Sequence, residues 1–208
     1  MKHILTIAGL SIGLLLLSAC NTLAASVAPE ATAERAALKT GEYTLDNTHT
    51  AVTFKVGHLG FSNYVGRFEL AEASLDFDTD NPTAATLEAI IDIASLDIAN
   101  DAFAETLIGP SWFDASAHPQ AIFRSTEISI ASDTTGTVTG DLVLKGVTKP
   151  VTFDVTFNGG DNDPLRGGYA IGFSATGKFN RSDFGITKFL GPVSDEVSID
   201  IEAEFVRE

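Results

Sequence analysis

The fold of this chain is constrained most by residues 137–157, which read TVTGDLVLKGVTKPVTFDVTF. Apolar and polar residues alternate along both halves of the stretch, and most strictly from Val151 to Phe157. Because successive side chains of a strand face opposite sides, each half is predicted to be a strand with one apolar face and one solvent-exposed face. Val143 is an exception, since it places an apolar side chain on the exposed face. Gly146 permits a tight reversal, and Pro150 belongs at a strand start or edge. The stretch therefore predicts a β-hairpin, which must bury its apolar face because a lone hairpin is marginal in water.

Similar alternation recurs along most of the chain. It predicts strands at 43–46, 50–57, 65–77 (one long strand interrupted near 71–72), 86–97, 121–130, 137–145, 148–157, 169–180 and 196–205. Residues 100–109 have apolar side chains at helical spacing and predict a short helix, and residues 110–116 predict a second short helix or a loop. About eight or nine long antiparallel strands with one apolar face are typical of a sandwich or a barrel, and a barrel removes exposed edges.

Composition narrows the class of partner. The chain of 208 residues has a formal net charge of −15 and only 13 Lys and Arg. A nucleic-acid-binding protein needs a basic surface, so that class is excluded, and no nucleic acid is expected as a partner. The length suits one domain preceded by a leader, and the single cysteine, Cys20, cannot form an intrachain disulfide.

The N-terminal residues predict export. Residues 4–17 form an apolar stretch too short to cross a bilayer comfortably, which is typical of a signal peptide. Leu17-Ser18-Ala19-Cys20 resembles the bacterial lipobox, so we expect a lipoprotein signal peptide at 1–19 and a lipidated Cys20. The alternative is cleavage after Ala28, which would discard Cys20. Residues 20–40 are expected to be a flexible tether and residues 41–208 the folded domain, located in the periplasm and anchored to the bacterial membrane.

Four motifs in order carry a family resemblance. The hairpin residues VTGDL at 138–142 and GVTKPV at 146–151 resemble the signature hairpin of the YceI-like proteins. Residues LD at 45–46, HTAVTFKV at 49–56 and HLGFS at 58–62 are similar to the opening motif of this family. The middle motif is similar to WFD at 112–114, HP at 118–119 and AIFRST at 121–126. The late motif is similar to GFSATG at 172–177 and NRSDFGI at 180–186. Val143 departs from the family's frequent threonine.

The resemblance implies an all-β fold, a closed antiparallel lipocalin-like β-barrel of about eight strands with a short helical insertion. It also implies a long isoprenoid lipid or quinone-type chain inside the barrel, bound by a carrier or storage protein that needs no other cofactor. The candidate lumen residues are Phe54, Val56, Phe61, Phe68, Leu107, Trp112, Phe113, Phe123, Leu142, Phe153, Phe173, Phe184 and Phe189. Arg181, with Arg67 or Lys188, is a candidate for a polar head group; alternatively, Arg181 pairs with Asp183 or nearby backbone.

Two other functions stay open. One is an enzyme acting on an isoprenoid lipid, with a metal held by His49, His58 or His118; their spacing matches no known metal motif, and no metal is expected. The chain also lacks a Gly-x-Ser-x-Gly elbow and a Ser-x-x-Lys pair, so no catalytic residues are expected. The other is a stress-related structural protein whose aromatic side chains fill the barrel. The oligomeric state is not predicted.

Overall fold

The computed structural model describes residues 31–34 and 37–208. The expected signal peptide, the lipobox and Cys20 lie outside the described residues. Within the described part of the chain, no helix has the length and apolar character that a membrane span requires.

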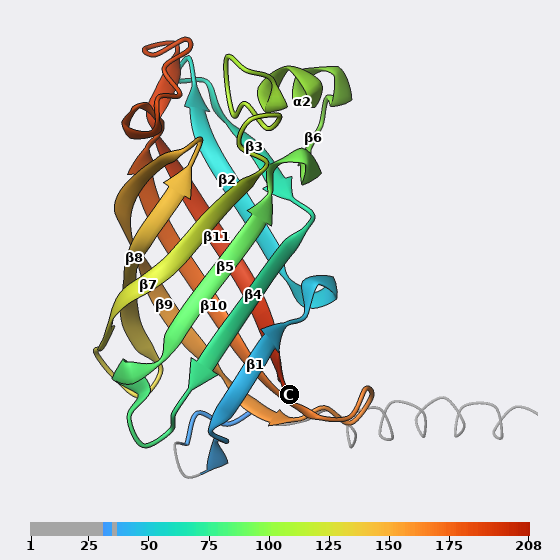
Figure 1. Cartoon of the computed structure of the whole chain (residues 1–208), viewed down its shortest axis with the longest axis vertical. Helices are drawn as coiled ribbons and strands as arrows, with labels where there is room; N and C mark the ends of the chain where they lie inside the picture. The colour runs from blue at the N-terminus through green and yellow to red at the C-terminus, as the bar shows by residue number, and fades with distance from the viewer. Residues whose placement is uncertain (1–30, 35–36) are drawn as a thin grey trace, which may run out of the picture.

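The described residues form a closed antiparallel β-barrel with one α-helix, as predicted (Figure 1). The strands are β1 (Gly41–Leu45), β2 (Ala51–His58), β3 (Ser62–Phe68), β4 (Ala71–Phe77), β5 (Thr86–Asp92), β6 (Leu96–Ile98), β7 (Gln120–Ile130), β8 (Thr135–Leu144), β9 (Val147–Asn162), β10 (Tyr169–Asn180) and β11 (Val193–Arg207). The helices are η2 (Asn47–His49), η3 (Pro82–Ala84), η4 (Ile93–Ser95), α2 (Asp101–Ile108) and η5 (Arg181–Phe184).

Eleven strand segments occupy eight strand positions around the barrel, because three of these positions are each shared by two consecutive segments. β1 and β2 both pair with β11. On their other side, β4 pairs with β1 and β3 pairs with β2. Next to these, β5 pairs with β4 and β6 pairs with β3. The barrel closes where β1 pairs with β11. The break between β3 and β4 falls at residues 69–70, slightly before the predicted position, because the Asn47 side chain bonds to the backbone of Glu69 and Ala71 there.

The predicted hairpin is β8–β9. Lys145 and Gly146 form its two-residue turn with φ of 51° and 73°, the left-handed pair that a type I′ turn requires. β9 is longer than the predicted strand 148–157: residues 158–162 continue it, because a bulge opposite Gly172–Phe173 absorbs the extra residue.

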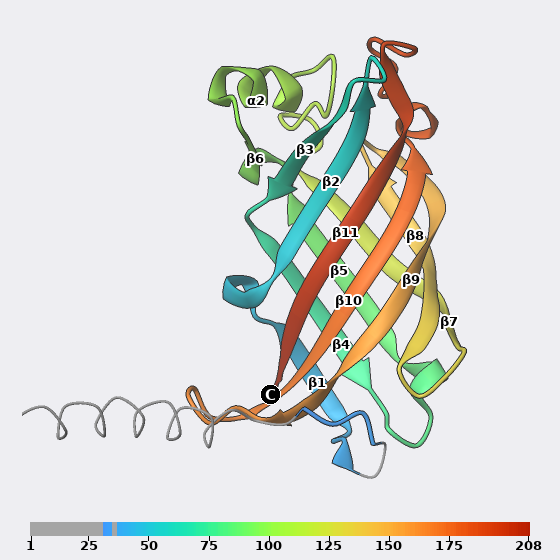
Figure 2. The same ribbon diagram turned by 180° about the vertical axis from the view of Figure 1, so that it is seen from behind.

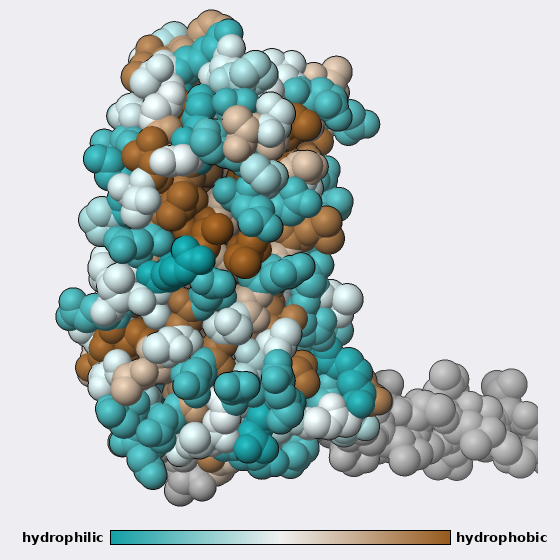
Figure 3. All heavy atoms as spheres, viewed as in Figure 1, coloured by the Kyte–Doolittle hydropathy of each residue, from teal (hydrophilic) through white to brown (hydrophobic). Residues whose placement is uncertain are grey.

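One face of each strand lines the interior and the other faces solvent. Val143 lies on the outer wall, as expected, and forms with Ile122 and Ile90 a cross-strand apolar row over β8, β7 and β5. Figure 3 shows an apolar patch over β5 and β7 on an otherwise largely hydrophilic wall. The outer row explains why the strand alternation in this region is imperfect.

The two ends of the barrel are built differently. The α2 end carries the β2–β3, β8–β9 and β10–β11 connections and the insertion of residues 99–119 (Figure 1). Asn100 caps α2, since its side chain accepts a hydrogen bond from the N–H of Phe103. The opposite end, called the β1 end, carries the β4–β5, β7–β8 and β9–β10 connections.

The end of the expected tether contacts the β1 end of the barrel. The Tyr43 hydroxyl donates to the Lys39 carbonyl at 2.6 Å, and the Tyr169 hydroxyl donates to the Ala37 carbonyl at 3.3 Å. Burial raises the pKa of Tyr43 to about 12, so this hydroxyl stays a donor. Thr32 also pairs with Gly160. These residues therefore differ from a free tether, because the two tyrosines at the base of the barrel need partners for their hydroxyls.

Candidate functional site: an internal apolar cavity

The barrel encloses a cavity of about 1180 Å³. Its lining extends from His58, Tyr64 and Pro192 at the α2 end to Leu38, Thr79 and Pro82 at the β1 end. The 12 residues of β10, at about 3.3 Å each and tilted by about 40°, correspond to a barrel height of about 30 Å. The volume exceeds the roughly 300–1,000 Å³ of common small-molecule pockets, so the cavity suits a longer ligand.

The structure places most of the predicted lumen residues on the cavity wall. These are Phe54, Val56, Phe68, Leu107, Trp112, Phe113, Phe123, Leu142, Phe153, Phe173 and Phe189. Phe61 and Phe184 do not line it. Phe61 lies in the β2–β3 turn and is 86% exposed, whereas Phe184 is buried behind the wall against Phe179, with ring centroids 5.2 Å apart. Both lie outside alternating strands, in a turn and in η5, where strand alternation gives no direction.

Aromatic rings lie against one another along the wall. Phe123 and Phe153 meet edge to face with centroids 5.3 Å apart, and Phe68 contacts both Phe54 at 5.8 Å and Phe113 at 5.9 Å. Edge-to-face pairs are favourable beyond the burial of their area. The rings thus stabilise one another at the wall and leave the interior open, unlike the alternative of a barrel filled by its aromatic side chains.

The insertion of residues 99–119 covers the α2 end of the cavity. Leu107 and Trp112 are buried and line the cavity, and Phe103 contacts Trp112 edge to face at 6.5 Å. Trp112 also contacts Phe189 of the β10–β11 loop, with centroids 6.2 Å apart. The insertion therefore covers one mouth of the cavity. At the edge of this cover lies Phe189, which contacts Trp112, lines the cavity and is also partly exposed to solvent.

Arg181 is the one charged side chain among the described residues that is both buried and part of the cavity wall. Its Nε donates to the Ser194 carbonyl, its Nη1 to the Ile186 and Lys188 carbonyls, and its Nη2 to the Val193 carbonyl, all within 3.0 Å. Burial lowers the pKa of Arg181 from its usual range. The side chain is thus held by backbone of the β10–β11 loop and of the first residues of β11, as in the alternative given above, and not by Asp183.

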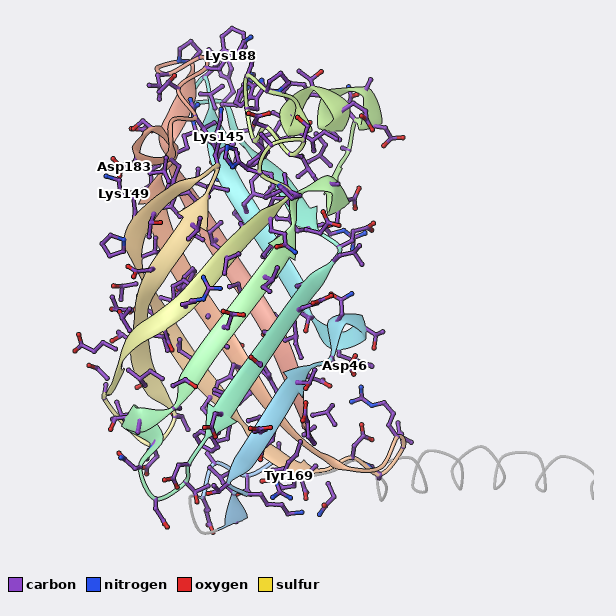
Figure 4. The ribbon with its side chains drawn as sticks, in the orientation of Figure 1. Asp46, Lys145, Lys149, Tyr169, Asp183 and Lys188 are labelled. Atoms are coloured by element: carbon purple, nitrogen blue, oxygen red, sulfur yellow. The ribbon has the colours of Figure 1, made fainter. Side chains whose placement is uncertain are left out.

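The other two head-group candidates lie away from the cavity wall. Arg67 is on the outer face, paired with Asp97 at 2.6 Å and Glu69 at 2.8 Å, and these carboxylates raise the pKa of Arg67. Arg67 therefore does not line the cavity, because its position on β3 alternates with the inward-facing Phe68. Lys188 lies at the α2 end with its ammonium 5.8 Å from the centre of the Phe189 ring (Figure 4).

The histidines do not converge on one site. His49 lies in η2, whereas His58 and His118 lie towards the α2 end. His49 shares a cluster with Asp46 and Glu204, the one potential metal-ligand group in the described ranges. The Arg166 guanidinium occupies the centre of this cluster: it contacts Asp46, lies 2.7 Å from His49 Nδ1 and donates to Glu204 at 2.9 Å. The cluster is thus an ion-pair network that joins the β9–β10 loop to the barrel.

Sequence reasoning missed the small side chains that leave the cavity open. Ala73, Ala89, Ala175 and Ala203 line it, as do residues 128–138 around the β7–β8 connection. The signal was present, because these alanines occupy inward positions of the same alternating strands as the phenylalanines.

Comparisons with known proteins agree with this architecture. A family model described as the YceI-like domain matches residues 43–205. The "UPF0312 protein" of Yersinia pestis (strain Pestoides F) is 36% identical over 204 residues, which cover 97% of each chain. The crystal structure of BcnA from Burkholderia cenocepacia matches with a TM-score of 0.68 and 27% identity, over 77% of this chain and 98% of that one. A polyisoprenoid binding domain from Saccharophagus degradans shares the fold, with a TM-score of 0.59 and 13% identity over 82% of this chain and all of that one.

A closed antiparallel barrel around a long apolar cavity defines the class of lipocalin-like barrel proteins. Within this class the chain belongs to the YceI-like family, since the family model spans most of its length.

Proposed function

We propose that this protein binds and shields a long apolar lipid, an isoprenoid or quinone-type chain, inside its barrel. The observation that carries the proposal is the apolar cavity of about 1180 Å³ that reaches towards both ends of the barrel. Burial of apolar surface contributes about 25 cal/mol per Å², so each 100 Å² of lipid removed from water stabilises the complex by about 2.5 kcal/mol. The related fold of a domain that is described as polyisoprenoid binding supports the same ligand class.

The proposed ligand is oriented, with its polar end at the α2 end of the barrel. Arg181 lines the cavity there, and its four hydrogen bonds to carbonyls account for four of its five N–H groups. The remaining N–H and the positive charge suit an oxygen-bearing head group. Phe68, Phe153 and Phe173 along the wall suit the tail. The wall binds a ligand by burial, which favours a carrier or storage protein over an enzyme.

The proposal includes a location in the periplasm and an anchor at Cys20, which rest on the lipobox-like residues 17–20. Cys20→Ala is expected to release the protein into the soluble periplasmic fraction. The intact mass of the membrane-bound protein should correspond to a chain that begins at Cys20 and carries acyl groups. A chain that begins after Ala28 without modification contradicts the anchor and leaves the lipid-binding proposal untouched.

Lipid extraction and mass spectrometry of the purified protein test the ligand. Ala175 lines the cavity on β10, whereas its neighbour Thr176 faces solvent. Ala175→Trp should therefore empty the barrel of lipid, and Thr176→Trp should leave the lipid content unchanged. Equal lipid content in both variants, or no lipid in the wild type after expression in its own host, contradicts the proposal.

A further inference from the structure

Four large apolar side chains project from the α2 end of the barrel. Leu59 (53% exposed) and Phe61 (86%) belong to the β2–β3 turn, and Phe189 (60%) and Leu190 (42%) belong to the β10–β11 loop. We call these four residues the apolar tip. Elsewhere the exposed strand positions are mostly polar, so the concentration of exposed apolar side chains on two short loops at one end requires an explanation.

The two loops form one preformed projection. The Leu59 N–H donates to the Pro192 carbonyl at 2.7 Å, and Val193 pairs with His58. Figure 2 shows the β2–β3 turn beside the β10–β11 loop at the top of the barrel, as does Figure 1. Arg181 holds the β10–β11 loop from inside through carbonyls on both sides of Phe189. Leu59 and Phe189 both have positive φ, of 52° and 56°, which bulky residues adopt only where the surrounding structure holds them.

The two segments that carry the apolar tip, residues 57–62 and 185–193, have a net charge of the opposite sign to that of the whole chain. The protein has 28 Asp and Glu and a net charge of −15, yet residues 57–62 and 185–193 contain no acidic residue. They contain Lys188 and His58, and Lys145 lies at the same end (Figure 4). The flanking acids are Asp183 and Asp195, and the Asp195 carboxylate accepts hydrogen bonds from Ser182. An apolar apex with adjacent cations is the pattern of a surface that binds at an anionic lipid interface.

We propose that the apolar tip inserts into the interfacial region of an anionic phospholipid bilayer. Four side chains on two loops are far fewer than a stable protein interface of roughly 800 Å² per partner requires, whereas shallow insertion requires only a few. Phe189 belongs to both the tip and the cavity wall and contacts Trp112 of the cover. A docked tip therefore places the covered mouth of the cavity against the membrane, where the lipid ligand passes. This passage rests on the proposed function; the insertion does not.

The experiment places a tryptophan at each end of the barrel. Phe61→Trp reports from the tip, and Leu165→Trp is its matched control, because Leu165 is 85% exposed in the β9–β10 loop at the β1 end. Both are made in the full chain with Cys20→Ala, which removes the expected anchor. Vesicles of equal parts phosphatidylcholine and phosphatidylglycerol with brominated acyl chains should quench the added fluorescence of Phe61→Trp and leave that of Leu165→Trp unchanged. The quenching should weaken in high salt and without phosphatidylglycerol.

Three results overturn the insertion: no quenching of Phe61→Trp, equal quenching of both variants, or a spectrum of Phe61→Trp that depends on protein concentration without vesicles. The last would assign the tip to contact with a second copy. The double variant Phe61→Asp with Leu190→Asp, neither of which lines the cavity, should weaken vesicle binding by about tenfold or more. Its transfer of a quinone from vesicles should slow, while its capacity for quinone added from solution stays unchanged. If the wild-type protein takes up no quinone while the fluorescence of the Phe61→Trp variant is still quenched by the vesicles, the proposed function fails and the insertion stands.

Discussion

At the scale of single residues, three glycines shape the cavity wall. A Cβ atom added to Gly66, Gly140 or Gly177 would lie 2.5 Å from a ring atom of Phe54, Phe123 or Phe153 respectively. Each phenylalanine ring therefore lies against a glycine of a neighbouring strand. Without these glycines the rings would have to swing towards the centre of the barrel, so the glycines help to keep the cavity open.

Gly177→Ala and Gly140→Ala should have different consequences. The three atoms nearest to the new methyl at position 177 all belong to the Phe153 ring, which can rotate into the cavity, so we expect a folded protein with less bound lipid. The methyl at position 140 also meets the backbone carbonyl of Arg124, which cannot move without distorting β7. Gly140→Ala should lower the melting temperature by more than Gly177→Ala. Similar melting temperatures with unchanged lipid content would show that the wall is more adaptable than its packing indicates.

Truncated phenylalanines should distinguish the packed part of the barrel from its open part. Phe184 is 1% exposed, lies outside the cavity and packs on Phe179, so Phe184→Ala should cost the ~3–5 kcal/mol usual for a solid core. Phe153→Ala enlarges a cavity that already exists and should cost less without ligand. Urea unfolding of both variants, stripped of lipid, measures the difference. An equal cost would mean that the wall around Phe153 is as densely packed as the region around Phe184.

Sequence alternation predicted residue directions well on the strands and poorly elsewhere. Phe54, Phe68, Phe153 and Phe173 face the cavity because each alternates with polar neighbours on a strand. Phe61 could not be placed, since a turn residue has no alternation to follow. For Arg181 the sequence offered nearby backbone as one of its alternatives, but it could not indicate which carbonyls accept, because their positions depend on the path of the chain after η5.

At the scale of elements, the segment before β1 contributes to the base of the barrel. Besides accepting the hydroxyl of Tyr43, Lys39 places its ammonium 4.3 Å from the centre of the Tyr169 ring and donates to Asn162 at 3.0 Å. A chain that begins at Gly41 loses two tyrosine hydrogen bonds and this cation–π contact, about 2–3 kcal/mol in all. Its melting temperature should fall by about 5–10 °C.

Tyr169→Phe is the matched control for this truncation, since it removes only the hydroxyl that bonds Ala37. Its melting temperature should fall by less than that of the truncated chain. A truncated chain that melts with wild type would restore the sequence expectation of a tether without contacts. The expectation arose because residues 21–40 are rich in alanine and have little to bury, whereas the contacts that the structure shows use backbone carbonyls, which every sequence has.

The β9–β10 connection is fastened by a charge network that titrates. The hydroxyl and N–H of Thr48, together with His49, hold the pKa of Asp46 at about 2, below its ordinary 3.8. A carboxylate with a depressed pKa stabilises the fold above its ordinary pKa, and this contribution is lost as the pH falls through the folded value. Wild type should therefore lose stability between about pH 4 and about pH 2, and Asp46→Asn should lose less over that interval. If the melting temperatures of wild type and Asp46→Asn fell by the same amount between about pH 4 and about pH 2, the proposed role of Asp46 would be contradicted.

The element boundaries show what a sequence can predict. The long strands and the helical insertion were predicted because their patterns extend over many residues. The break between β1 and β2 was predicted as well, between the strands expected at 43–46 and 50–57. The break between β5 and β6 was missed, because the strand expected at 86–97 runs through η4, a short 3-10 turn fixed by an aspartate cap in which Asp92 accepts from the N–H of Ala94.

At the scale of the whole molecule, the barrel is packed at its ends and open between them. Tyr43, Tyr169 and Ile171 are almost fully buried at the β1 end, and Leu107, Trp112 and Ile93 are buried towards the α2 end. The two ends belong to separate apolar clusters, and the cavity wall joins them. We therefore expect the barrel to fold without a ligand, and a ligand that fills the middle to add contacts between the two clusters.

A bound lipid should therefore raise the melting temperature of the whole barrel. Ligand present at about 100 times its dissociation constant stabilises the folded state by about 2.7 kcal/mol, which corresponds to about 5–10 °C for a domain of this size. A long-chain quinone added to lipid-free wild type should produce this shift and quench the fluorescence of Trp112, the single tryptophan, which lines the cavity. Ala175→Trp should melt without the shift, and Thr176→Trp should shift as wild type does. An equal shift in both variants would place the lipid on the outer wall, beside Ile90 and Ile122, and not inside the barrel.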